Sequence, residues 1–351
     1  MDYIEIKGYK SIKDARIELR PINILIGANG SGKSNFLSFI EFLNHLYERK
    51  LTKYIDLNGG EDKFLHHGSK ITEQLQATLS FNNQVNGYSF TLEKGTEGLL
   101  FKREYLLYHN HPVNIAEFAK ESNIKTSVGY RAQYVRKYIQ GLKKYHFHDT
   151  GKNSPFNKLS RIPNDTFFPY EKGDNLAAFL YWIQQNNMLI YQRIIKVIQS
   201  IAPYFSDFYF QANTEGYVRL SWQDKYSSTV YGATDLSDGT IRFIALAALF
   251  LQPNLPQTII IDEPELGLHP FALSKLAGMI KSAAAKGSQV IVATQSTDLL
   301  SYFEPDDIIA VDQKEGASVF NRLKQDELDI WLNDYSLGEL WKRNIITEGQ
   351  P

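Results

Sequence analysis

Residues 27–34 read Gly27-Ala28-Asn29-Gly30-Ser31-Gly32-Lys33-Ser34, a complete G-x-x-x-x-G-K-S motif. An apolar run, 22–26, precedes the motif, and apolar side chains recur at helical spacing from about Lys33 to Tyr47. A glycine-rich turn between a strand and a helix points its backbone N–H groups inward around phosphates. The motif therefore predicts a nucleoside triphosphate site.

The residue types in this loop suggest how ATP and magnesium are held. Lys33 is expected to reach the β- and γ-phosphates, and Ser34 is expected to hold Mg²⁺. The N-terminus of the helix adds its own positive pole. We predict that ATP is bound by Asn29, Gly30, Ser31, Gly32, Lys33, Ser34 and Asn35.

A second stretch, 258–263, is a β-branched apolar run that ends in Asp262 and Glu263. This pattern is typical of a buried parallel strand whose carboxyl end meets the nucleotide. We predict that Asp262 is the second Mg²⁺ partner. Glu263, one residue further along, is the candidate general base for the attacking water. An ordinary strand with acidic ends is the alternative interpretation.

The stretch Leu236-Ser237-Asp238-Gly239-Thr240 precedes a helical pattern and, by itself, would be only a helix cap. Placed between the phosphate loop and the acidic strand, it resembles the signature motif of ATP-binding-cassette (ABC) ATPases, in the form found in SMC and RecF-like proteins. The resemblance implies that Ser237 and Gly239 cap the γ-phosphate bound to a second subunit. It therefore implies a homodimer with composite ATP sites.

Other segments follow the order of the same family. Residues 264–270 resemble its D-loop, which contacts the partner subunit, and residues 6–14 resemble the opening of RecF, SMC and OLD-type heads. The strand pattern 289–294 leads to Gln295, where most ABC ATPases carry a histidine. Glutamine can hydrogen-bond a phosphate or a water but cannot become a cation. We therefore predict that Gln295 acts beside Glu263 and that hydrolysis is slow.

These motifs predict an α/β fold, an ABC-ATPase head of the P-loop NTPase class with a mixed β lobe. We expect one domain over residues 1–350, with a helical, locally basic insertion over 100–205. Within that insertion, helices are predicted at 132–142, 175–183 and 188–201. The family's Q-loop has no clear counterpart, and His148 and Asp149 are the candidates to replace it, although a polar turn is the alternative.

The composition fits a globular protein: hydrophobic residues make up 43% of the chain and charged residues 22%. The sequence suggests neither a membrane-spanning stretch nor a secretory signal, so we predict a cytoplasmic protein without a membrane partner. The chain has no cysteine, which excludes disulfides, thiolate zinc sites and cysteine nucleophiles.

Charge is distributed unevenly, although the net charge is only −1. Residues 101–152 carry ten lysines and arginines against four acids, whereas residues 301–351 carry five against eleven. Tyrosines alternate with the cations of the basic stretch, as on surfaces that bind nucleic acid. A solvated amphipathic helix is the alternative. The predicted nucleic-acid contacts are Arg131, Arg136, Lys137, Lys143 and Lys144.

The resemblance implies an ATPase whose ATP-gated homodimer regulates DNA transactions or a separate effector protein, such as a nuclease, in antiphage defence. Two alternatives remain open. One is a nucleotide-gated scaffold without hydrolysis, which the neutral Gln295 would suit. The other is the ATPase subunit of a transporter, against which both the signature motif and Gln295 count.

Overall fold

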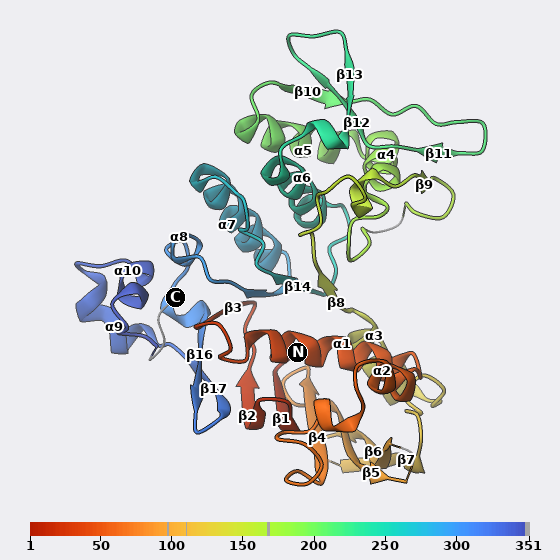
Figure 1. Ribbon diagram of the computed structural model, residues 1–351, viewed down its shortest axis with the longest axis vertical. Helices are drawn as coiled ribbons and strands as arrows, with labels where there is room; N and C mark the ends of the chain where they lie inside the picture. The colour runs from red at the N-terminus through yellow and green to blue at the C-terminus, as the bar shows by residue number, and fades with distance from the viewer. Residues whose placement is uncertain (97, 110, 167–168, 348–351) are drawn as a thin grey trace.

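The computed structural model describes residues 1–96, 98–109, 111–166 and 169–347. A mainly parallel sheet crosses the middle of the molecule (Figure 1). Its edge strand β17 is antiparallel to β16, and the other strands are parallel to one another. In order across the sheet, the strands are β17 (Ala317–Arg322), β16 (Ile308–Lys314), β3 (Ile22–Ile26), β15 (Gln289–Ala293), β14 (Thr258–Asp262) and β8 (Leu142–Tyr145).

The central sheet separates two hydrophobic cores. Side chains alternate between the faces of a strand. On β14, Ile259 and Ile261 enter the core above the sheet in Figure 1, and Ile260 enters the core below it. Strands buried on both faces need nearly continuous apolar sequence, which explains the runs in β3, β14 and β15.

The β lobe lies below the central sheet in Figure 1 and contains an antiparallel sheet. Helices α1 (Lys33–Tyr47), α2 (Leu51–Leu57) and α3 (Tyr130–Gln140) lie beside it, and α1 separates it from the central sheet. A 3₁₀ turn, η1, covers Glu61–Lys63. The strands of this sheet, in order, are β2 (Ile12–Glu18), β1 (Tyr3–Tyr9), β4 (Gln74–Phe81), β5 (Asn86–Gly95), β6 (Gly98–Tyr108) and β7 (His111–Ala119).

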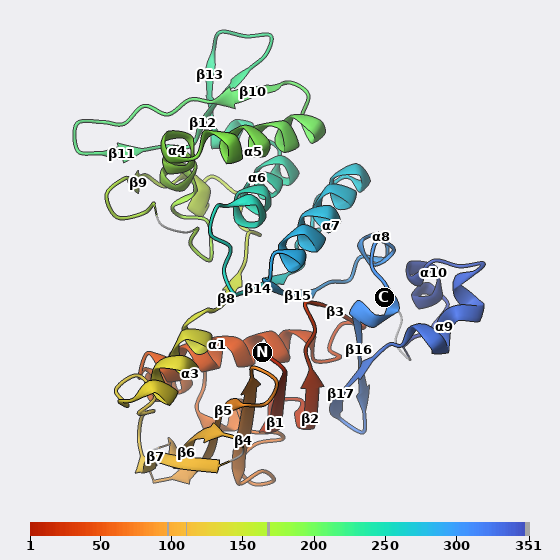
Figure 2. The same cartoon turned by 180° about the vertical axis from the view of Figure 1, so that it is seen from behind.

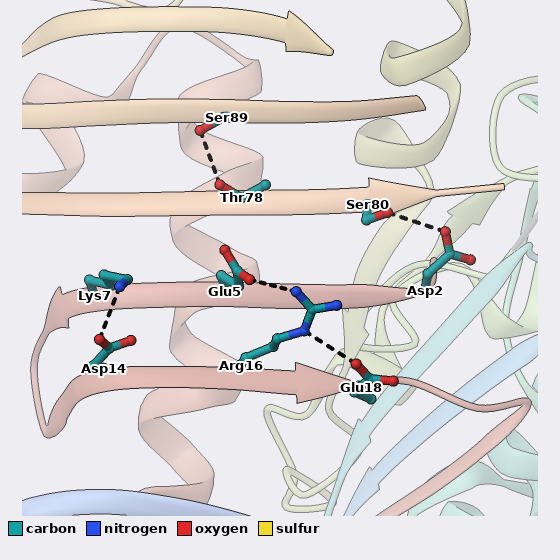
Figure 3. A network of polar contacts seen from close by, with 9 residues as sticks. All are labelled: Asp2, Glu5, Lys7, Asp14, Arg16, Glu18, Thr78, Ser80 and Ser89. Carbon is teal, nitrogen blue, oxygen red and sulfur yellow. Dashed lines mark hydrogen bonds and ion pairs between the residues drawn. The ribbon is translucent and has the colours of Figure 1, made fainter. Parts of the chain in front are cut away.

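One face of this β sheet is polar (Figure 3). Arg16 lies 2.8 Å from Glu5 and 3.2 Å from Glu18, with ion pairs to both. On the opposite face, Ile4 and Ile6 are fully buried in the core that also contains α1. The alternation fixes the register of the sheet, and the exposed ion pairs add at most about 1 kcal/mol each.

The helical lobe lies on the other side of the central sheet (Figure 2). Helix α6 is buried along most of its length in the upper core. The C-terminal elements lie at the end of the sheet near β16 and β17. The elements of the helical lobe are η2 (Pro155–Asn157), β9 (Ser160–Arg161), α4 (Leu176–Asn186), α5 (Met188–Ile201), β10 (Phe205–Phe208), β11 (Tyr217–Val218), β12 (Ser221–Asp224), β13 (Val230–Gly232), η3 (Ala233–Asp235), α6 (Asp238–Leu251) and α7 (Pro270–Ala285). The C-terminal elements are α8 (Thr297–Leu300), η4 (Pro305–Asp307), α9 (Gln325–Leu332) and α10 (Leu337–Lys342).

The predicted helical insertion over 100–205 needs correction. Helices α3, α4 and α5 match the expected ones, but the range also includes most of β6, all of β7 and β8, an edge strand of the central sheet. Within the range, Phe101 and Leu106 on β6 belong to the β-lobe core, and each lies between less buried residues, a strand pattern that the predicted helical region overlooked. The last residues of the predicted domain, 348–350, lie outside the described residues.

Over the part of the chain that the structure describes, no helix combines the length and the apolar character needed to cross a membrane.

Candidate nucleotide site

The phosphate loop connects β3 to α1, and close packing explains its glycines. A Cβ on Gly27 would lie 2.1 Å from the carbonyl oxygen of Val311, and a Cβ on Gly32 would lie 1.9 Å from Oγ of Ser318. Gly30 meets nothing within 4 Å, but its φ of 81° is one that glycine adopts most easily. The loop is thus held against β16 and β17 by its backbone.

Two polar side chains in the loop suit an anionic ligand. Lys33 is 6% exposed, and its ammonium donates to the carbonyls of Gly27, at 2.5 Å, and Ala28, at 3.1 Å. Burial lowers the pKa of Lys33, and the nearby acids, with Glu263 foremost, oppose this effect. The buried hydroxyl of Ser31 has no hydrogen-bond partner among the described residues. A triphosphate would supply acceptors to both groups, so this donor set fits it.

The remaining predicted loop residues differ in exposure. Asn29, Gly30 and Ser34 are exposed. Asn35 instead donates from Nδ2 to Oγ of Ser11, at 2.7 Å, and therefore ties α1 to the turn after β1. Ser318 had not been predicted to take part, yet its hydroxyl donates to the Ser31 carbonyl at 2.6 Å and supports the loop from β17.

Asp262 ends β14, in line with the carboxyl ends of β15 and β3, because these strands are parallel. The carboxylate of Asp262 and the hydroxyl of Ser34 are hard oxygen donors of the kind that Mg²⁺ prefers, so the residues fit that ion. Asp262 Oδ2 also lies 3.1 Å from Nζ of Lys144 on β8. The sequence had suggested a surface role for Lys144.

Glu263 and Gln295, the two predicted catalytic residues, are in contact. Gln295 Nε2 donates to Glu263 Oε1 at 2.6 Å. Glu263 has a φ of 42°, in the left-handed region that costs a non-glycine residue about 1–2 kcal/mol. Its N–H bonds to the Ala293 carbonyl at 2.8 Å, which stabilises this turn against β15.

Glu265 is a half-buried acid that the sequence analysis had not singled out. Its Oε1 accepts from the Thr294 hydroxyl at 2.5 Å and from the Gln295 N–H at 3.1 Å. Its Oε2 is buried and has no hydrogen-bond partner among the described residues, and burial raises the pKa of Glu265. Glu265 therefore fixes the backbone that carries Gln295. Its place two residues after the predicted base was the available signal.

The segment after β8 reaches the same edge of the sheet, as the Q-loop prediction required. Nε2 of His148 donates to the Asp262 carbonyl at 3.0 Å. Asp149 instead accepts from the Gly151 N–H, at 3.3 Å. The ring of His146 lies 4.0 Å from that of His148, and burial, with added repulsion from His148 and Lys144, lowers the pKa of His146.

Arg242 on α6 joins this segment to the predicted D-loop. Its guanidinium donates to the carbonyls of Phe147, at 3.2 Å, and His148, at 2.9 Å. It also donates to the Leu266 carbonyl at 2.8 Å. The planar group thus connects the nucleotide side of the sheet to the helix that begins at the signature motif.

The signature residues lie away from the phosphate loop of their own chain. Ser237 caps α6, and its Oγ accepts from the Thr240 N–H at 3.2 Å. A Cβ on Gly239 would lie 2.3 Å from the Gly267 carbonyl oxygen, so the predicted D-loop packs directly on it. Ser237, Gly239 and His269 line a cavity of about 280 Å³ to which none of residues 27–35 contributes. Figures 1 and 2 both show the central sheet between α6 and α1.

The predicted basic surface is divided by the fold. Arg131, Arg136 and Lys137 lie on α3, where Arg131 stacks on Tyr108 at 4.8 Å from the ring centroid. Arg136 donates to the Lys125 carbonyl at 2.8 Å. The other two predicted cations, Lys143 and Lys144, are half-buried on β8, so the five do not form one exposed patch.

Similarity to known proteins agrees with this geometry. Residues 22–301 match the family described as "AAA domain, putative AbiEii toxin, Type IV TA system". The DNA replication and repair protein RecF of Salmonella typhimurium is 32% identical over 95 residues, 26% of this chain and 27% of RecF. RecF of Klebsiella pneumoniae is 33% identical over 95 residues, which are again 26% of this chain and 27% of RecF. The chain thus matches only about a quarter of the length of these curated relatives.

The fold also matches solved SMC heads. One structure, of the SMC head bound to the C-winged helix domain of ScpA, has a TM-score of 0.63 at 18% identity and covers 93% of this chain and 98% of that one. An SMC head with an extended coiled coil, bound to the C-terminal domain of ScpA from Pyrococcus furiosus, has a TM-score of 0.59 at 17% identity, covering 95% and 98%. These likenesses confirm the predicted fold. The chain has the ABC-type P-loop NTPase fold seen in SMC heads, and it belongs to the family described as an AAA domain of putative AbiEii type.

Proposed function

We propose that this protein is a homodimeric ATP switch in which each ATP is bound between the phosphate loop of one subunit and the signature helix of the other. The main observation behind this proposal is the position of Ser237 and Gly239. They line a cavity with D-loop residues, and residues 27–35 of the same chain do not reach it. A second copy can bring a phosphate to this helix N-terminus, where a hydroxyl and backbone N–H groups are available as donors.

Within one subunit, Lys33 leaves the carbonyls of Gly27 and Ala28 and pairs with the phosphates. Ser34 and Asp262 hold Mg²⁺, which supplies charge neutralisation on the phosphate oxygens. The loop N–H groups and the Ser31 hydroxyl complete the phosphate contacts. This phosphate-binding role is supported by the burial of Lys33 and Ser31 and by the lack of a hydrogen-bond partner for the Ser31 hydroxyl among the described residues.

For hydrolysis, Glu263 accepts the proton of the attacking water, and Gln295 orients the carboxylate through its 2.6 Å bond. Because Gln295 is neutral, it contributes no positive charge opposite the γ-phosphate, and turnover is slow. The same bond favours the second candidate function, a nucleotide-gated scaffold, because it occupies one oxygen of the base. ATP binding and dimerisation are common to both functions.

The output of the switch is the regulation of DNA or of a separate effector, such as a nuclease, in antiphage defence. The cations of α3, the name of the RecF relatives and the toxin-system description of the family support this proposal. The ScpA domains bound to the similar SMC heads support a protein partner. A transporter role finds no support in the site, and a cytoplasmic location remains a prediction.

A mixing experiment tests the composite site. Lys33→Ala removes the phosphate lysine, and Ser237→Arg blocks the signature contact, so each variant alone should lose ATPase activity. A one-to-one mixture forms heterodimers in which one site has an intact loop and an intact signature. Recovery of part of the wild-type ATPase rate on mixing supports the proposal. A mixture as inactive as its components contradicts it.

A further inference from the structure

Lys144 forms an ion pair with Asp262, the carboxylate of the proposed magnesium site. Its Nζ is 3.1 Å from Asp262 Oδ2, and the two side chains are only 23% and 18% exposed. Strand pairing places Lys144 beside Ile260, so the side chain extends forward along β14 to reach Asp262. The contact therefore depends on the central sheet itself rather than on a chance surface approach.

Lys144 also lies beside a cavity that is lined by acidic residues. It lines a cavity of about 400 Å³ between α1, β8 and residues 171–172. The cavity contains three carboxylates, from Glu41, Glu48 and Glu171, together with Lys50 and Lys172. A lysine that left Asp262 would thus find acidic partners in the cavity that it already lines.

We propose that Lys144 is a displaceable cation of the magnesium site: it neutralises Asp262 when no nucleotide is bound and moves toward the cavity carboxylates when Mg·ATP binds. Two cations on one largely buried carboxylate repel each other, so the lysine and the metal compete. The competition makes Mg²⁺ binding weak until a nucleotide contributes its own phosphate oxygens. This inference rests on the proposed role of Asp262.

Movement of Lys144 would also affect the segment that leads into the helical lobe. The Glu171 carbonyl accepts from the His146 N–H at 2.8 Å, two residues beyond Lys144 on the chain. A lysine that pairs with the Glu171 carboxylate adds a charge at the segment that leads into α4. Lys144 therefore acts as a positioning residue, through Asp262 on one side and Glu171 on the other, and it need not touch the nucleotide.

The test measures metal binding directly, with Mn²⁺ as the probe in place of Mg²⁺. Free Mn²⁺ is followed by electron paramagnetic resonance in titrations of wild-type protein and of Lys144→Met, with and without a non-hydrolysable ATP analogue. Loss of the competing charge is expected to tighten Mn²⁺ binding by about threefold to tenfold, with the larger effect in the absence of nucleotide. Lys143→Met, at the neighbouring position of the same strand, is the matched control. Lys144→Arg, which keeps the charge, should behave like wild type.

The outcomes separate this inference from the proposed site. If Asp262→Asn abolishes Mn²⁺ binding while Lys144→Met equals wild type, the site stands and the displaceable cation is wrong. If Lys144→Met weakens Mn²⁺ or nucleotide binding, Lys144 supports the site instead of competing with the metal, and the inference is also overturned. If Asp262→Asn leaves Mn²⁺ binding unchanged, the proposed metal site itself fails. Thermal unfolding of each variant confirms that it is folded.

Discussion

Gln295 Nε2 donates to Glu263 Oε1 at 2.6 Å, so a side chain two residues beyond β15 contacts the acid that directly follows β14. The two strands are paired in parallel, with Asp262 opposite Ala293. Because Glu265 in turn holds the Gln295 N–H, at 3.1 Å, the base is positioned through a chain of contacts rather than by its own backbone alone. Under the proposed function, this arrangement lets a neutral glutamine act at the position where most ABC ATPases carry a histidine.

Gln295→Ala tests this orientation. Loss of the amide leaves the Glu263 carboxylate without its donor, so kcat should fall by about tenfold or more, whereas the ATP concentration for half-saturation should change little. Phosphate release at saturating and limiting ATP separates the two parameters. An unchanged kcat would show that Glu263 does not depend on Gln295.

Arg242→Gln tests the connection between the nucleotide side and the signature helix. The substitution removes the guanidinium that bonds three carbonyls, and we expect the free energy of unfolding to fall by about 1.5–3 kcal/mol. ATP binding by the isolated subunit should persist, but ATP-dependent dimerisation should weaken. Denaturant unfolding and sedimentation measure the two effects. Arg242→Lys should recover only part of the stability, and equal dimerisation in all three proteins would contradict the role.

Glu265→Gln should change how stability depends on pH. Burial raises the pKa of Glu265 in the folded protein above its usual value of 4.5, so the folded state binds its proton more tightly than the unfolded state. Its contribution to stability is therefore present below pH 4.5 and is lost as pH rises through the folded-state pKa. The variant has no such loss, so its stability relative to wild type should increase as the pH rises above 4.5 and through the folded-state pKa of Glu265. Parallel stability curves for the two proteins would contradict this account.

The cations of α3 are tested without disturbing β8. Replacing Arg131 and Lys137 by Gln should weaken DNA binding and reduce the slope of log K against log salt by up to about 0.9 for each phosphate that the variant no longer neutralises. Fluorescence anisotropy at several salt concentrations gives both quantities. Arg193 and Lys196, which are exposed on α5, provide a matched control pair. If both pairs have the same effect, α3 is an ordinary solvated helix.

Much of the fold and site could be predicted because the signals are local. The phosphate loop, the acidic strand and helices α4 and α5 are encoded in spacing and residue type. β8 was missed because it is only four residues long, contains Lys143 and Lys144, and is defined by its pairing with a strand more than a hundred residues later. Lys144 was therefore assigned to a surface instead of to Asp262. Glu265 lay in a segment interpreted only as a partner-contacting loop.

The central claim is that ATP holds two copies together until Glu263 allows hydrolysis. Its most direct test is sedimentation of Glu263→Gln over a range of ATP concentrations, with Glu263→Gln/Ser237→Arg as control. We predict slower hydrolysis, with an ATP-dependent dimer for the single variant and a monomer for the double variant. A single variant that remains monomeric at every ATP concentration would contradict the account.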